Sequence, residues 1–125
     1  MSEMPPQAWV FRARCSRVID GDTVDVTLDC GMHTHRIERL RLLGVQAPEL
    51  KDHPRGSEAK GWVQNWIEHA FLDARDDAVR DWPLTVATSK SDSFGRFLAL
   101  VWRRSDGAQL NEALLEAGMA KVYQR

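Results

Sequence analysis

Cysteine is scarce in this chain, with two residues among 125, Cys15 and Cys30. They flank a predicted turn at Asp20-Gly21. If that turn pairs its two strands symmetrically, Cys15 faces Val26 and not Cys30, so a disulfide would require a slipped register. We therefore expect two free thiols in a reducing compartment.

Long apolar runs and a basic start are also absent from the sequence. No stretch is long enough to cross a membrane. Residues 1–6 contain neither the basic nor the apolar part of a signal peptide. We expect a cytoplasmic monomer that engages no membrane, with residues 1–7 as a flexible tail on a single domain spanning 1–125.

An excess of positive charge is the third absence. The chain has 17 Lys and Arg against 18 Asp and Glu, a formal net charge of −1. Proteins that bind nucleic acid by broad attraction are usually strongly basic, so any such binding here should rest on a local patch. A hydrophobic fraction of 43% with 28% charged residues is typical of one soluble globular domain of this length.

Alternation of apolar and polar residues predicts five strands, over 8–19, 24–28, 35–45, 83–88 and 97–102. Helical spacing predicts a helix over 57–74, capped by Ser57, and another over 110–117. Trp62 and Trp66, one helical turn apart, fit the core better than base stacking. This order favours an α+β fold, mainly β, with a five-stranded OB-type barrel and two or three packed helices.

The stretch from Val18 to Glu49 gathers residue types that phosphodiester chemistry requires. It opens with Asp-Gly-Asp between two β-branched runs, a pattern that by itself indicates only a tight turn between strands. It closes with a strand that stops at Gly44 and a corner in which Pro48 limits the backbone. The corner should hold the Glu49 carboxylate in a fixed place.

The segments 18–24 and 41–49, followed by 92–96 and 110–114, resemble the staphylococcal nuclease (thermonuclease) family in order and spacing. The resemblance runs from about Arg12 to Val122. It implies a five-stranded OB-type barrel with helices packed on it. It also implies calcium-dependent cleavage of DNA or RNA, for which we expect a single-stranded substrate.

The resemblance places three residues in catalytic roles. Arg41 and Arg96 occupy the positions that stabilise the phosphate, a role that suits arginine because its guanidinium grips two oxygens and stays protonated. Glu49 occupies the position of the general base or water-positioning residue. Without the resemblance, surface residues in ion pairs would be the favoured interpretation of both arginines, and a solvated loop glutamate that of Glu49.

The resemblance also implies a calcium site. In it Asp22 is a direct ligand and Asp20 supports the site through hydrogen bonds. Active members of the family have an acidic residue followed by threonine where this chain has Gln46-Ala47. Ala47 still offers its backbone carbonyl and Gln46 an amide oxygen, but the lost charge should weaken calcium binding by roughly 30-fold or more.

Four further residues, Lys90, Phe94, Lys121 and Tyr123, are expected to contact the nucleic acid. Two functional interpretations stay open. The first is a metal-dependent phosphodiesterase weakened by Gln46. The second is a catalytically inactive OB-type module that binds nucleic acid or protein, as happens in tandem nuclease-like and Tudor coactivator proteins.

Overall fold

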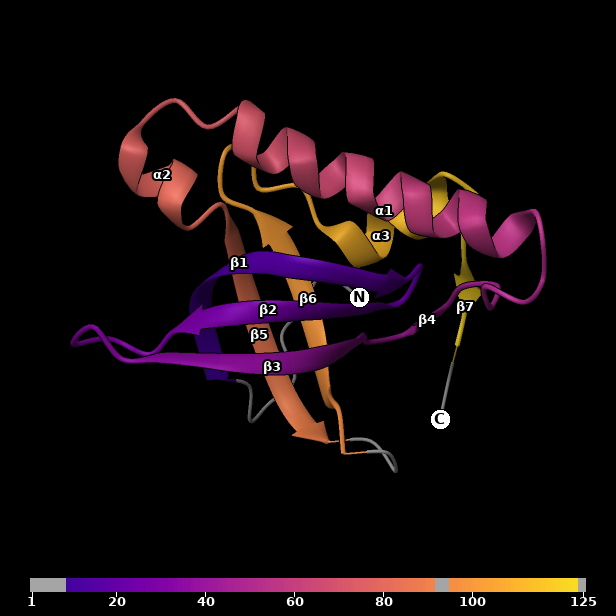
Figure 1. The fold of residues 1–125 in the computed structure, drawn as a ribbon, viewed down its shortest axis with the longest axis horizontal. Coiled ribbons are helices and arrows are strands. Elements are labelled where there is room, and N and C mark those ends of the chain that lie inside the picture. The colour runs from indigo at the N-terminus through magenta and orange to yellow at the C-terminus, as the bar shows by residue number, and fades with distance from the viewer. Residues whose placement is uncertain (1–8, 92–94, 124–125) are drawn as a thin grey trace.

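Five strands close into a barrel in the computed structural model, which describes residues 9–91 and 95–123. The barrel order is β1-β2-β3-β6-β5, and the pairs are antiparallel except for the parallel β3 and β6 (Figure 1). The strands are β1 (Trp9–Asp20), β2 (Thr23–Asp29), β3 (His35–Leu42), β5 (Leu84–Ser91) and β6 (Phe97–Arg103). The predicted barrel is confirmed, whereas the predicted tail, residues 1–7, lies outside the described residues.

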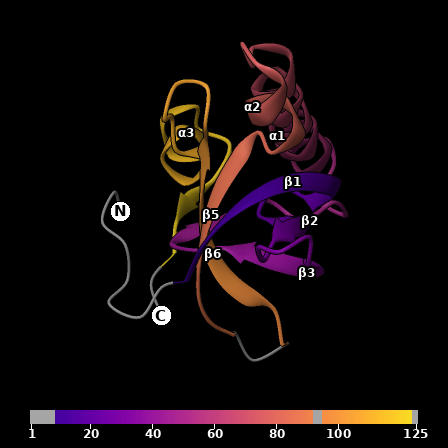
Figure 2. The same cartoon turned by 90° about the vertical axis from the view of Figure 1, so that its left-hand side faces the viewer.

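Three helices and a small second sheet complete the fold over the described residues. The helices are α1 (Arg55–Leu72), α2 (Asp77–Asp81) and α3 (Leu110–Glu116), and the two-residue strands β4 (Val45–Gln46) and β7 (Lys121–Val122) pair antiparallel. Figure 2 shows α1 and α3 side by side against the barrel, where α1 packs on β1 and α3 on β6. Among the described helices, none is both long and apolar enough to span a membrane.

The core lies between the barrel and these helices. Val24, Val26 and Leu28 of β2 are buried, as the alternation predicts. Trp66 of α1 is buried with them and Trp62 packs against the same cluster, which confirms the core interpretation of both tryptophans.

The cysteines lie as the strand count predicts. Cys15 is the register partner of Val26, and both thiols are free. Burial raises the pKa of the Cys15 thiol to about 11, so this group is a poor nucleophile. Cys30 is exposed at the end of β2.

Two element boundaries differ from the prediction. Strand β3 ends at Leu42 and not at residue 45, because Gly44 turns the chain with φ +78° before β4 begins. Helix α1 begins at Arg55, with Pro54 at its N-cap. The Ser57 hydroxyl, expected to cap the helix, instead donates to the Pro54 carbonyl at 3.1 Å.

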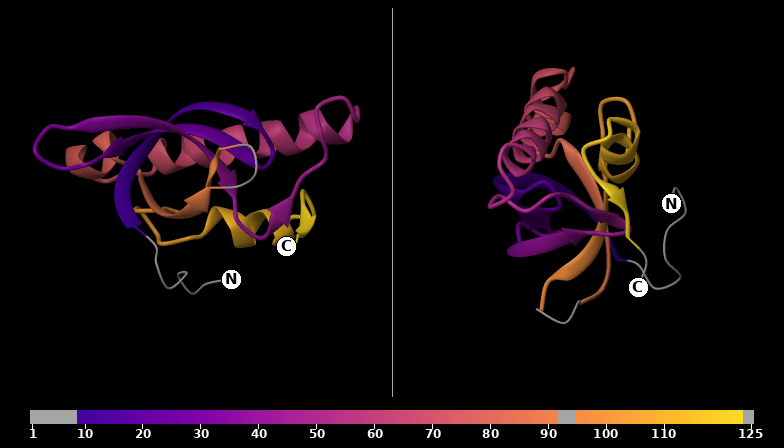
Figure 3. Two further views of the ribbon diagram at one scale, coloured as in Figure 1. Left: turned by 90° about the horizontal axis from the view of Figure 1, so that it is seen from below. Right: turned by 90° about the vertical axis from the view of Figure 1, so that its right-hand side faces the viewer.

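The turn between β1 and β2 packs closely against two other segments. A Cβ atom on Gly21 would lie 2.6 Å from the Cβ of Ala47 and 2.8 Å from that of Ala59, so only glycine fits here. This contact brings the turn, β4 and the first part of α1 to one end of the barrel (Figure 1). The loop between β2 and β3 lies at the opposite end (Figure 3, left).

Asn111 fixes the turn that leads from β3 to β4. Its side chain is fully buried, donates to the carbonyls of Leu43 at 2.9 Å and Ala99 at 3.1 Å, and accepts from the amide of Val101 at 3.1 Å. A single amide thus joins α3, β6 and the β3–β4 turn. The Gln46-Ala47 segment follows directly from that anchored turn.

Candidate active site

Asp22 is the centre of a buried polar cluster at this end of the barrel. The residue is only 8% exposed. One carboxylate oxygen, Oδ2, accepts from the amide of Ala47 at 2.9 Å, and the other, Oδ1, accepts from the Thr23 hydroxyl at 3.1 Å. The amide of Asp22 in turn donates to Asp20 Oδ1 at 3.0 Å. The turn and the segment after β4 are therefore joined through one carboxylate.

The two arginines singled out by sequence converge on this cluster. Arg41 Nη2 lies 3.5 Å from Asp22 Oδ2, and its Nη1 donates to backbone carbonyls on both sides of the β3–β4 turn. Arg96 Nη1 donates to the Thr23 hydroxyl at 3.5 Å. Thr23 is also the register partner of Arg41 in the β2–β3 ladder. Asp22 and Thr23 thus link the two guanidinium groups, which lie far apart in the sequence.

Burial, and after it the hydrogen-bonded carboxyl group of Asp20, raise the pKa of Asp22 from its ordinary value to about 6. The Ala47 amide and the Arg41 guanidinium act in the opposite direction. Two carboxyl groups held this close favour a shared proton or a shared cation.

Tyr123 flanks Arg41 on its other side. The guanidinium carbon of Arg41 lies 5.7 Å from the centre of the Tyr123 ring, which suits a cation–π contact. Both residues line a small cavity of about 110 Å³ together with Gly44 and Leu98. The aromatic ring is 40% exposed and is therefore accessible to a base or sugar.

Glu49 lies at the corner after β4, held by more than Pro48. The amide of Asp52 donates to the Glu49 carbonyl at 2.9 Å, and a Cβ atom on Gly56 would overlap that same carbonyl oxygen. The Glu49 carboxylate is 67% exposed and lies 3.1 Å from the ammonium of Lys51. The backbone at the corner is fixed, and the carboxylate is open to solvent.

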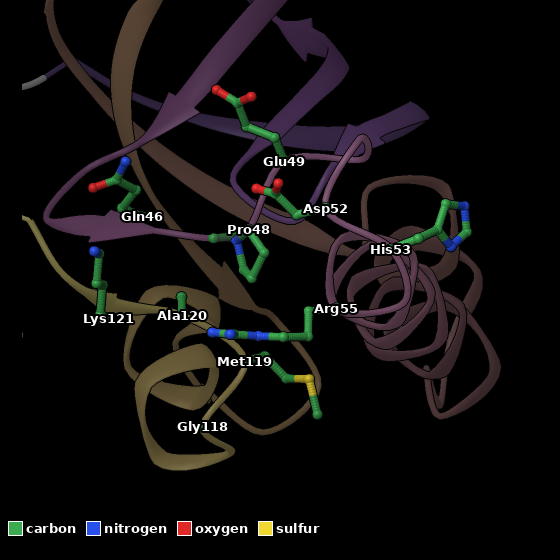
Figure 4. A pocket seen from close by; sticks show the side chains of 11 residues that line it. Gln46, Pro48, Glu49, Asp52, His53, Arg55, Gly118, Met119, Ala120 and Lys121 are labelled. Atoms are coloured by element: carbon green, nitrogen blue, oxygen red, sulfur yellow. The ribbon is translucent and has the colours of Figure 1, made fainter.

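A groove of about 710 Å³ runs between this corner and the segment after α3. Figure 4 shows its lining, with Gln46, Pro48 and Glu49 on one side and Met119, Ala120 and Lys121 on the other. Asp52, His53 and Arg55 close the end next to α1.

Two of the four predicted nucleic-acid contacts, Lys121 and Tyr123, lie in this region. Lys121 lines the groove, Tyr123 adjoins Arg41, and Lys90 is exposed near the end of β5. Phe94 lies outside the described residues.

Sequence reasoning missed Thr23 and Arg55. The position of Thr23 directly after Asp22 and opposite Arg41 was a usable signal. Arg55 lay in a loop without periodicity, so nothing in the sequence marked it.

The donor set at Asp22 fits a hard cation. Asp20 and Asp22 bring two carboxyl groups together, and the ligand set expected from the sequence adds the amide oxygen of Gln46 and the backbone carbonyl of Ala47; calcium prefers oxygen ligands of these kinds. No cluster of three or more acidic, histidine or cysteine residues suited to a metal is found in the described part of the chain. The set therefore has a low negative charge for a calcium site.

Comparison with known proteins identifies the family of this chain. The family model described as "Staphylococcal nuclease homologue" matches residues 39–125. An "Uncharacterized endonuclease" of Escherichia coli O157:H7 is 32% identical over 116 residues, which cover 92% of this chain and 63% of that protein. "Protein ParB" of Escherichia coli is 29% identical (93% and 60% covered), and the "Thermonuclease" of Staphylococcus hyicus is 29% identical (85% and 56% covered).

The chain thus spans about three fifths of the length of these curated relatives. The family match covers the Arg41, Gln46-Ala47 and Arg96 segments, and the relatives extend the similarity over the Asp20-Asp22 turn as well. The chain belongs to the staphylococcal nuclease homologue family.

Proposed function

We propose that this protein cleaves phosphodiester bonds in single-stranded DNA or RNA, in a reaction that depends on calcium. The observation that carries the proposal is the convergence of Arg41 and Arg96 on Asp22 and Thr23. Two guanidinium groups held close together can donate to the oxygens of one phosphate. Their positive charge would stabilise the negative charge that builds on those oxygens during hydrolysis.

In the proposed reaction a water molecule attacks phosphorus, and one P–O ester bond breaks to release an oxygen that takes up a proton from solvent. Glu49 accepts the proton of that water, a role for which its exposed carboxylate on a fixed backbone is suited. Arg41 and Arg96 donate to the non-bridging oxygens as their charge increases. Tyr123 stacks against the nucleotide beside Arg41.

Asp22 and Asp20, with the Gln46 amide and the Ala47 carbonyl, would hold the calcium ion. A bound divalent cation supplies charge stabilisation at the phosphate and polarises water. Because Gln46 replaces a carboxylate of the active family members, we propose that this protein binds calcium weakly and cleaves slowly.

A second candidate is a binding module that has lost catalysis. The low charge of the Asp22 donor set favours it, because the described residues contain no group of three or more acidic, histidine or cysteine side chains that could hold a metal ion. The two candidates differ in whether a restored carboxylate at position 46 produces activity.

Substitution Gln46→Asp should tighten calcium binding by roughly 30-fold, because it adds one unit charge at ligand distance beside Asp22. Cleavage of a single-stranded oligonucleotide at subsaturating calcium should rise with it. Titration calorimetry measures the first quantity and a gel assay the second, with Gln64→Asp on the exposed face of α1 as the matched control.

Tighter calcium binding without any cleavage would favour the binding module. Unchanged calcium affinity would remove Asp22 and Gln46 from the proposed ligand set. A gain in cleavage that survives in the double variant Gln46→Asp/Glu49→Gln would mean that a contaminating nuclease or another base acts.

A further inference from the structure

We propose that the groove between the Glu49 corner and β7 is a second phosphate subsite, in which Arg55 and Lys121 bind the backbone phosphate next to the scissile one. The inference rests on the proposed function and adds to it a route for the strand. It assigns Arg55, a residue outside the motifs of the sequence, to substrate binding.

The size and lining of the groove suit one nucleotide. Its volume of about 710 Å³ falls within the usual range for small-molecule sites. Pro48, Met119 and Ala120 form apolar parts of the wall, while Arg55 and Lys121 contribute positive charge. In Figure 4 the guanidinium of Arg55 extends across the groove toward Ala120.

The positively charged side chains of Arg55 and Lys121 are available to bind an anion in the groove. In the described part of the chain, neither Arg55 nor Lys121 forms an ion pair or a side-chain hydrogen bond, whereas the exposed Arg12, Arg36 and Arg39 each pair with a carboxylate. The Glu49 carboxylate forms its ion pair with Lys51, a residue that does not line the groove.

Figure 4 also shows the carboxyl groups of Glu49 and Asp52 pointing away from the Arg55 guanidinium. The cationic side of the groove is therefore free to receive an anion.

The groove continues directly into the candidate active site. Gln46 and Ala47 line it, and Ala47 also donates to Asp22. On the opposite side Lys121 pairs with Gln46 across β4 and β7, and Tyr123, two residues later, adjoins Arg41. A strand whose phosphate lies at Arg41 would thus have its neighbouring nucleotide in the groove.

The test uses thymidine trinucleotide, which has two phosphates, and its two analogues with one phosphate replaced by a neutral methylphosphonate. Binding is measured by calorimetry in chelator, so that no cleavage occurs. Each replacement should weaken binding to the wild type by about tenfold, the effect of losing charge-assisted hydrogen bonds, because one phosphate lies at Arg41 and Arg96 and the other in the groove. In the double variant Arg55→Gln/Lys121→Gln one of the two replacements should have less than about a twofold effect, while the other should keep its tenfold penalty.

The matched control is Arg75→Gln/Lys60→Gln, which removes the same charge outside the groove and outside any ion pair of the described residues. It should retain both tenfold penalties. The salt dependence of binding gives a second readout, because each phosphate contact that is lost should reduce the slope of log affinity against log salt by about 0.7.

Methylphosphonate penalties that are equal in the wild type and the groove variant for both replacements would overturn the subsite, as would a wild type that binds no trinucleotide. Cleavage of a longer strand by the same preparations reports on the proposed function separately. Cleavage with no groove effect would refute the subsite alone. A groove effect without cleavage would refute the proposed reaction and leave the subsite standing.

Discussion

Replacement of Glu49 by glutamine should lower the turnover of nucleic-acid cleavage by at least about 100-fold, the usual contribution of a positioned base. Glutamine keeps the size and the hydrogen-bonding capacity of the side chain but accepts no proton from water. The backbone at the corner is held by the Asp52 amide and by Gly56, so the variant should keep its fold. Binding of single-stranded DNA in chelator should therefore be unchanged.

The measurement is the single-turnover rate on a labelled oligonucleotide, with thermal melting as a check on folding. Glu68→Gln, at an exposed position of α1, is the matched control and should cleave like the wild type. Undiminished cleavage by Glu49→Gln would show that another group activates the water.

Substitution of Arg41 or Arg96 by lysine should each lower turnover by about 10²- to 10³-fold, the usual loss for one donor to a developing oxyanion. Lysine keeps the positive charge but loses the planar fork that binds two oxygens. Because both guanidinium groups act at one cluster, the double variant should lose less than the product of the single losses.

Arg39→Lys is the control for these variants, because Arg39 lies on the same strand and pairs with Asp25 at 2.8 Å. Its turnover should match that of the wild type. Stability is measured in parallel, since Arg41 also donates to the carbonyls of Leu42 and Val45. If Arg41→Lys and Arg96→Lys lose no more turnover than Arg39→Lys, neither Arg41 nor Arg96 takes part in catalysis.

The sequence was sufficient for the barrel because strand alternation and helical spacing are local signals. In the β1–β2 hairpin, pairing about the predicted Asp20-Gly21 turn places Cys15 opposite Val26, as observed, although the strands reach that pairing through two register shifts that the sequence does not show. The boundaries at Leu42 and Arg55 were missed, because they depend on a left-handed glycine and on packing of the helix start against the Glu49 carbonyl. Packing between distant segments leaves no periodic signal.

The motifs of the sequence predicted which residues form the candidate site. The contacts between those residues could not be predicted from the sequence. Gly21 illustrates the difference: the pattern indicated a turn glycine, whereas the structure requires it for contact with Ala47 and Ala59. The hydroxyl of Thr23, which links Asp22 to Arg96, follows from strand register, which needs the closed barrel. The groove around Arg55 arises where three separate segments meet, so no single stretch of sequence encodes it.

The most direct test of the central claim is the rate at which the purified wild type cleaves a single-stranded oligonucleotide in calcium, and again after chelation. We predict slow cleavage that rises with calcium at concentrations above those the family's active members need, because Gln46 replaces a carboxylate. Chelation should abolish it. Cleavage that is equally fast in chelator, or no cleavage even at saturating calcium, would contradict the assignment of a calcium-dependent nuclease site to Asp22, Arg41, Glu49 and Arg96.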